Sequence, residues 1–147
     1  MMKKIVASGL AAGMFLGTMM TDLGVAEMAA HDTYKREAVK VVQTAGRDRL
    51  GDFAPDFARY NDDILFGEVW SKNDVLSLHD RSIVTVSALV ASGVIDNSLK
   101  FHIASAKKNG VTKDEMVEII TQLGFYAGWP KAWAAFNMAK EVYADNN

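Results

Sequence analysis

Apolar residues recur three and four positions apart along most of the chain, which is the spacing of one face of an α-helix. The pattern predicts six helices, over residues 33–45, 55–70, 78–92, 97–108, 113–123 and 130–143. The sequence has no internal repeat of about 20 to 50 residues, and its Asn-Gly pair lacks the alternating flanks of a β-hairpin. Together these patterns predict an all-α bundle.

Residues that commonly begin a helix stand before most of the later stretches. Ser77 and Asp96 are suitable N-terminal caps for the helices that follow them. Thr112 and Glu115 have the spacing of a capping box, in which each side chain bonds to the backbone of the other residue. Pro130 suits the first turn of the last helix because its missing N–H has no helical partner there. These signals fix where the four C-terminal helices are expected to start.

The earlier stretches carry less uniform signals. The helix expected over 33–45 rests on cap candidates at positions 32 and 33 and on apolar residues spaced by three and four. The stretch over 55–70 has Asp62 and Asp63 in its middle and is interrupted by Gly67. The β-branched content of 78–92 could also indicate a strand, but its length and its cap favour a buried helix.

Short connections predict how neighbouring helices pair. Asn109 and Gly110 form a ready left-handed stop, and about two residues join the helices over 97–108 and 113–123. We therefore expect these two helices to form an antiparallel helical hairpin. Between Gly124 and Gly128 we expect a loosened segment.

A different pattern occupies the first 26 residues. Lys3 and Lys4 precede 17 uncharged residues, 5–21, and small residues follow at the positions that a signal peptidase reads. We expect a leader that is cleaved after Ala26, with cleavage at positions 29 or 30 as alternatives, and a domain over 27–147. An uncleaved membrane anchor and a buried helix are the other interpretations of this stretch.

Composition narrows the chemistry that the domain can perform. Half of the 147 residues are hydrophobic and 23% are charged, which suits one globular domain. Sixteen basic against 18 acidic residues give a net charge of −2, so we expect no nucleic-acid partner. The absence of cysteine excludes disulfides, thiolate metal sites and cysteine nucleophiles.

Three residues are the candidate catalytic groups. His102 follows Leu99 by three positions, so helical geometry turns it toward the buried face, where it is either a core histidine or a proton carrier. Glu118, in the next predicted helix, could meet His102 across the expected hairpin or could simply be a solvated residue. Arg81 could hold a carboxylate through two parallel hydrogen bonds, or could pair with an acidic neighbour.

Four further residues are candidates for binding a substrate. Glu68 and Trp70 lie in the stretch FGEVW, and Tyr126 and Trp129 lie in the aromatic turn YAGWP. The turn YAGWP is suited to lining a pocket, although such a turn is usually only structural. The alternatives for FGEVW are a core position for Trp70 and a surface position at a helix end for Glu68. The spacing of the three histidines matches no metal-binding motif, so we expect no metal site.

With these residues in view, the chain from about Phe57 to Tyr143 resembles the carboxymuconolactone decarboxylase family, which shares an all-helical fold with the alkylhydroperoxidase D proteins. The resemblance is carried by FGEVW, by LHDRSIVTVSALVASG from Leu78, by the stretch from Leu99 to Ile120, and by YAGWP. It points to His102, Glu118 and Arg81 as pocket residues. Many relatives have Glu after that arginine, where this chain has Ser82. The peroxidase branch uses a Cys-x-x-Cys pair, which a chain without cysteine cannot supply.

The resemblance implies a cofactor-free lyase that acts on a small carboxylated lactone or a related organic acid. It also implies a homo-oligomer, a trimer or a hexamer. With the leader removed, we expect a periplasmic or secreted protein without stable membrane association. A non-catalytic helical subunit and a binding module for small acids are the alternatives.

Overall fold

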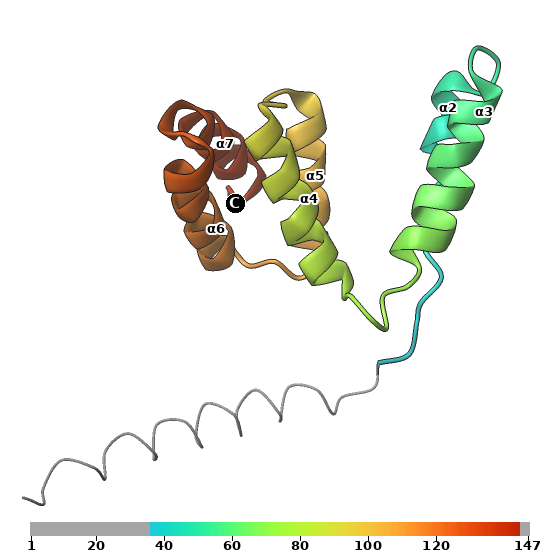
Figure 1. Ribbon diagram of the computed structural model, residues 1–147, viewed down its shortest axis with the longest axis horizontal. Helices are drawn as coiled ribbons and strands as arrows, with labels where there is room; N and C mark the ends of the chain where they lie inside the picture. Colours follow the sequence, from blue (N-terminus) through green and yellow to red (C-terminus); the bar gives the residue numbers. More distant parts are fainter. Residues whose placement is uncertain (1–35, 145–147) are drawn as a thin grey trace, which may run out of the picture. The chain divides into compact units, whose positions relative to one another are not determined.

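The computed structural model describes residues 36–144, and every regular element in this range is a helix (Figure 1). The all-α prediction is therefore confirmed. The expected leader, its cleavage site and the start of the first predicted helix lie outside the described residues. Within the described range no helix is both long and apolar enough to cross a membrane.

Within residues 36–144, seven helical elements follow one another. They are α2 (Ala45–Leu50), α3 (Pro55–Arg59), η1 (Tyr60–Trp70), α4 (Leu78–Ser92), α5 (Asn97–Lys108), α6 (Lys113–Ala127) and α7 (Trp129–Val142). The element η1 is a π-helix that continues α3 without a break, so the stretch over 55–70 is helical throughout, as predicted. Residues 125–127 belong to α6 and are not loosened, because the helix ends only at Gly128, whose φ is +111°.

The helices α4 to α7 share one hydrophobic core. Each contributes fully or largely buried apolar residues, which include Val86 and Val90 of α4, Leu99 and Ile103 of α5, Met116 and Ile120 of α6, and three alanines of α7. Figure 1 shows α4 beside α5 and α6 beside α7. Although α5 and α6 are consecutive, each packs chiefly on α4 and α7 and not on the other, which differs from the expected hairpin.

The small side chains of α7 account for this arrangement. Ala132, Ala135 and Ala139 are buried at spacings of three and four, so one side of α7 is narrow and can approach its neighbours closely. This side of α7 takes the place beside α5 that the expected hairpin gave to α6.

The predicted caps of the bundle are present. The Ser77 hydroxyl accepts the N–H of Asp80, and the Asp96 carboxylate accepts the N–H of Ser98. Thr112 and Glu115 form the complete capping box at the start of α6. Local sequence signals therefore define where these helices begin.

The first predicted helix is wrong over residues 36–44, which contain no helix. The side-chain amide of Asn73 donates to the carbonyl oxygen of Val39 at 2.7 Å and accepts from its N–H at 2.8 Å. The Ser71 hydroxyl accepts the N–H of Val41 at 2.8 Å. Because these side chains satisfy the backbone of the segment, it does not need the hydrogen bonds of a helix.

Candidate functional site

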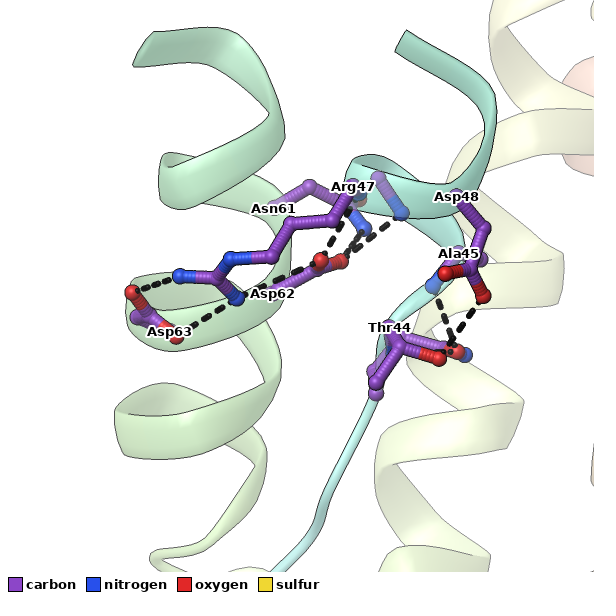
Figure 2. Close-up of polar contacts among 9 residues, drawn as sticks. Thr44, Ala45, Arg47, Asp48, Asn61, Asp62 and Asp63 are labelled. Carbon is purple, nitrogen blue, oxygen red and sulfur yellow. Dashed lines mark hydrogen bonds and ion pairs between the residues drawn. The ribbon is translucent and has the colours of Figure 1, made fainter. Parts of the chain in front are cut away.

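A buried carboxylate fixes the short helix α2 against η1 (Figure 2). The side chain of Asp62 is fully buried and accepts the N–H of Gly46 at 2.8 Å and that of Arg47 at 2.9 Å. The side-chain amide of Asn61 donates to the same carboxylate at 2.9 Å. Burial acts to raise the pKa of Asp62, but the donors of Asn61, Arg47 and Gly46 outweigh it, so the pKa lies below its usual value. Asp62 is therefore a permanently charged cap and not a proton donor.

The two arginines of α2 point in different directions. The Arg47 guanidinium contacts Asp62 at 3.4 Å and forms two hydrogen bonds with Asp63, at 3.0 and 2.6 Å. Arg49 lies two residues later, which is about 200° around a helix and places it on the opposite face. Arg49 makes no hydrogen bond or ion pair with another described residue. Arg47 thus helps to fix α2 against η1, whereas the guanidinium of Arg49 is available to bind a ligand.

Two clefts meet at His102. The large cleft has a volume of about 890 Å³ and is lined by α2, α3, η1 and the N-terminal half of α5, and its polar residues include Arg49, Asn61, Asn97 and Ser98. The small cleft, about 180 Å³, is lined by residues 41–43, η1, the start of α4 and the C-terminal half of α5. Both clefts include His102 together with Gln43, Phe66 and Phe101.

His102 is half-buried between the core and these clefts. Its neighbour in sequence, Ile103, is completely buried, whereas the Phe101 ring stands edge-on to the imidazole at 5.3 Å between centroids. Burial lowers the pKa of His102 below its usual value of 6.5. The imidazole is therefore mainly neutral at pH 7 in the free protein.

The charges around His102 have one sign. Arg49 lines the large cleft and Lys108 lines the small one. Among the described residues that line either cleft there is no aspartate or glutamate. The region beside His102 therefore favours an anionic ligand.

Comparison with known proteins places the chain in a family. The sequence model of the carboxymuconolactone decarboxylase family matches residues 55–141. The chain is 43% identical over 98 residues to the 4-carboxymuconolactone decarboxylase of Acinetobacter baylyi, a match that covers 67% of this chain and 72% of that protein. The chain belongs to the carboxymuconolactone decarboxylase family. It is also 27% identical over 86 residues to an uncharacterized 15.0 kDa protein of Paracoccus denitrificans, covering 58% of this chain and 63% of that one.

Two of the candidate site residues predicted from the sequence, His102 and Trp70, line the clefts. His102 lines both, and the buried Trp70 lines the small one. Arg81 lines neither cleft, because its guanidinium donates to the carbonyl oxygens of Leu76 at 3.1 Å and Lys72 at 2.9 Å. These two hydrogen bonds stabilise the connection between η1 and α4. The carboxylate-binding role expected for Arg81 in this carboxymuconolactone decarboxylase family member stays a prediction.

The two candidate acids are exposed. Neither Glu118 nor Glu68 lines a cleft, and within residues 36–144 no hydrogen bond joins His102 to Glu118. The reason lies in the packing of the bundle, since α6 contacts α4 and α7 and does not face His102 on α5.

The aromatic turn lies away from His102. Tyr126 is 84% exposed, and Trp129 lines a separate groove of about 200 Å³ with Trp133 and Phe136. Within the described part of the family member, no group of three His, Asp or Glu residues is arranged to hold a metal ion.

Sequence reasoning missed Arg49, Asn97, Ser98 and Phe101 as cleft residues. Asn97 and Ser98 carried one usable signal, since they begin the same helix as His102 and lie about one turn before it. Arg49 carried none, because its position depends on contacts between α2 and residues about 15 positions further along the chain.

Proposed function

We propose that the protein is a lyase that removes CO₂ from a small carboxylated unsaturated lactone or a related organic acid. Family membership and the decarboxylase activity named for the Acinetobacter relative support this reaction class. The observation that carries the proposal is the position of the half-buried His102, which lines two clefts that each hold one cationic residue and, among the described residues, no carboxylate.

The proposed reaction has two chemical steps. The bond between a ring carbon and its carboxylate breaks, CO₂ leaves, and the electron pair moves through the adjacent double bond onto the lactone carbonyl oxygen. The resulting enolate then takes one proton at carbon. The net change consumes one proton and releases one CO₂, so the site must stabilise an oxyanion and deliver a proton.

His102 is the proposed proton carrier. Binding of an anionic substrate beside the imidazole favours its protonated form, against the effect of burial. His102 then takes a proton from solvent when substrate binds and gives it to the carbon after CO₂ has left. Its neutral state in the free protein leaves it ready for that uptake.

The side-chain amide of Asn97 and the hydroxyl of Ser98 are the proposed donors to the developing oxyanion. Both line the large cleft and lie about one helical turn before His102 on α5. The acidic candidates Glu118 and Glu68 have no part in this assignment, because their side chains lie outside the two clefts.

A turnover assay tests the proposal. The purified protein is incubated with 4-carboxymuconolactone and with related unsaturated lactone acids, and released CO₂ is measured. We expect turnover that falls by about 10²- to 10⁴-fold in His102→Ala, the usual contribution of general acid–base catalysis. Ser105→Ala, next to His102 in the small cleft but not assigned to the reaction, is the control variant for folding.

A binding module for small organic acids is the second candidate function. It is favoured by the absence, among the described residues, of a carboxylate hydrogen-bonded to His102. Binding of the lactone acids without CO₂ release from any of them would select this function over the lyase. Turnover that persists unchanged in His102→Ala would contradict the mechanism.

A further inference from the structure

We propose that Arg49 is the residue that binds a substrate carboxylate in the large cleft, and that Asp62 is the residue that positions it. The inference deepens the function proposed above and rests on it for the nature of the natural ligand. It assigns the anion-binding role to a helix that precedes the matched family region, residues 55–141.

The first step concerns which cation is available. Among the basic side chains of α2 and α3, Arg47 is bound to Asp62 and Asp63, and Arg59 stacks over the Tyr60 ring at 4.5 Å. Arg49 lines the cleft and contacts no acidic side chain of the described residues. A guanidinium suits this role because its planar fork matches the two oxygens of a carboxylate.

The second step concerns why α2 holds a fixed place. A helix of six residues is too short to be stable alone, so its orientation depends on tertiary contacts. Here those contacts are unusually specific: the fully buried Asp62 accepts two consecutive backbone N–H groups of α2. A Cβ at Gly46 would lie 2.7 Å from both the Ala58 carbonyl oxygen and Asp62 Oδ1, so only glycine permits this approach.

The third step links the two features. Because the contacts of Gly46 and Arg47 with Asp62 fix the orientation of the whole of α2, they also fix the position of Arg49, which lines the large cleft. His102 lines the same cleft from α5. Loss of the Asp62 contacts would leave Arg49 chemically intact but no longer held in the cleft that His102 lines.

Binding of adipate, an unreactive dicarboxylate, tests Arg49 without relying on turnover. Calorimetry should show that the wild-type protein binds adipate more tightly than the uncharged adipamide. We expect Arg49→Gln to weaken adipate binding by about tenfold or more and to leave adipamide binding unchanged. Arg49→Lys should retain part of the affinity, and Arg59→Gln is the matched control that should behave as wild type. Equal affinity of the wild type for the two ligands, or an unchanged adipate affinity in Arg49→Gln, would overturn the assignment.

A double-variant cycle tests Asp62. Asp62→Asn should weaken adipate binding to a similar extent as Arg49→Gln, and the double variant should lose no more than either single variant. A purely structural role predicts losses that add and that also affect adipamide. If Asp62→Asn does not fold, Asp63→Asn provides a milder test, because it removes only the exposed contact of Arg47. Asp63→Asn should then give a smaller loss of adipate affinity of the same kind.

The outcomes separate this inference from the proposed lyase activity. Loss of adipate binding in Arg49→Gln, with no turnover by the wild type, keeps Arg49 as the anion-binding residue and removes the lyase. Turnover that depends on His102, with an unchanged KM in Arg49→Gln, keeps the lyase and removes Arg49.

Discussion

His79 and His102 have pKa values shifted in opposite directions because their surroundings differ. Burial alone lowers the pKa of His102. His79 is hydrogen-bonded to Asp80 at 2.9 Å and to Glu115 at 3.3 Å, and the hydrogen bond to Asp80 is the main cause of its raised pKa. The histidine with the lowered pKa lines the clefts, and the one with the raised pKa joins α4 to α6.

The pH dependence of turnover should follow the proposed proton uptake by His102. The free protein has a His102 pKa below 6.5, so kcat/KM should fall as pH rises above that value. Bound substrate favours the protonated imidazole, so kcat should stay constant to a higher pH before it falls. Steady-state rates between about pH 5 and about pH 8 measure both profiles, and His102→Gln should remove both transitions. A kcat/KM that increases with pH across this range would mean that the imidazole acts as a base.

At the scale of elements, the sequence predicts the helix boundaries that depend on residues close together in the chain. The starts of α4, α5 and α6 follow from caps that lie within three residues of the backbone they bind. The segment 36–44 could not be predicted in this way, because the side chains that bond to it are 30 and 34 residues distant. The same holds for the site: helical spacing predicts that His102 faces inward, but Arg49, which lines the same cleft, comes from a separate helix. Which helix faces lie together is decided by packing: the side of α7 that carries its buried alanines packs in the bundle, and α5 and α6 each contact α7 in place of the pairing with each other that the short connection suggests.

Asn73 should be the residue that holds the segment 36–44. Its side chain is buried and bonds to both backbone groups of Val39 and to the carbonyl oxygen of Trp70. Asn73→Ala leaves these groups without partners, and we expect a loss of about 1 to 3 kcal/mol in the free energy of unfolding. Hydrogen exchange should also become faster at the amide of Val39. Asp74→Ala, an exposed neighbour, is the control; equal protection of Val39 in both variants would argue against this role.

The connection between α4 and α6 should depend on pH through His79. A raised pKa in the folded state means that the stabilisation is complete below the unfolded value of 6.5 and is lost as pH rises through the folded pKa. The change should stay below about 1 kcal/mol, because all three side chains are partly exposed. Denaturant unfolding at about pH 6 and about pH 9 should show a smaller difference in His79→Gln than in wild type. If the two proteins lose the same stability over this range, His79 does not contribute.

At the scale of the whole molecule, the described residues leave many large apolar side chains exposed. Two groups stand out: Phe53 and Phe57 near α3, and Phe125, Tyr126, Trp129 and Trp133 on α6 and α7. Isolated exposed apolar residues are ordinary, but contiguous aromatic patches usually mark contacts with other chains. The expected assembly of several copies remains our proposal for what covers them.

Light scattering of the purified protein should therefore return the mass of a homo-oligomer, a trimer or a hexamer. Trp133→Glu places a charge in the aromatic patch and should shift the mass toward the monomer, because burial of an unpaired charge in an interface is costly. Lys140→Glu, also on α7 but outside the patch, is the control. A monomer mass for wild type at micromolar concentration would contradict the proposal.

The proposed export of the protein is tested by its mass. Cleavage after Ala26 removes 26 of 147 residues and leaves 121. Intact-mass spectrometry of the protein from a bacterial periplasmic fraction should show this shortened chain. A full-length mass confined to the cytoplasmic fraction would rule out the leader.

The place of α7 in the bundle has a consequence for synthesis on the ribosome. Since α7 packs against α4, α5 and α6, no earlier set of helices can close the core without it. Part of the apolar core formed by α4, α5 and α6 therefore stays open to water until α7 has been synthesised, however well the earlier helices are capped. The chain should depend on chaperones during that interval, and collapse to the native bundle should follow only when α7 is free to pack.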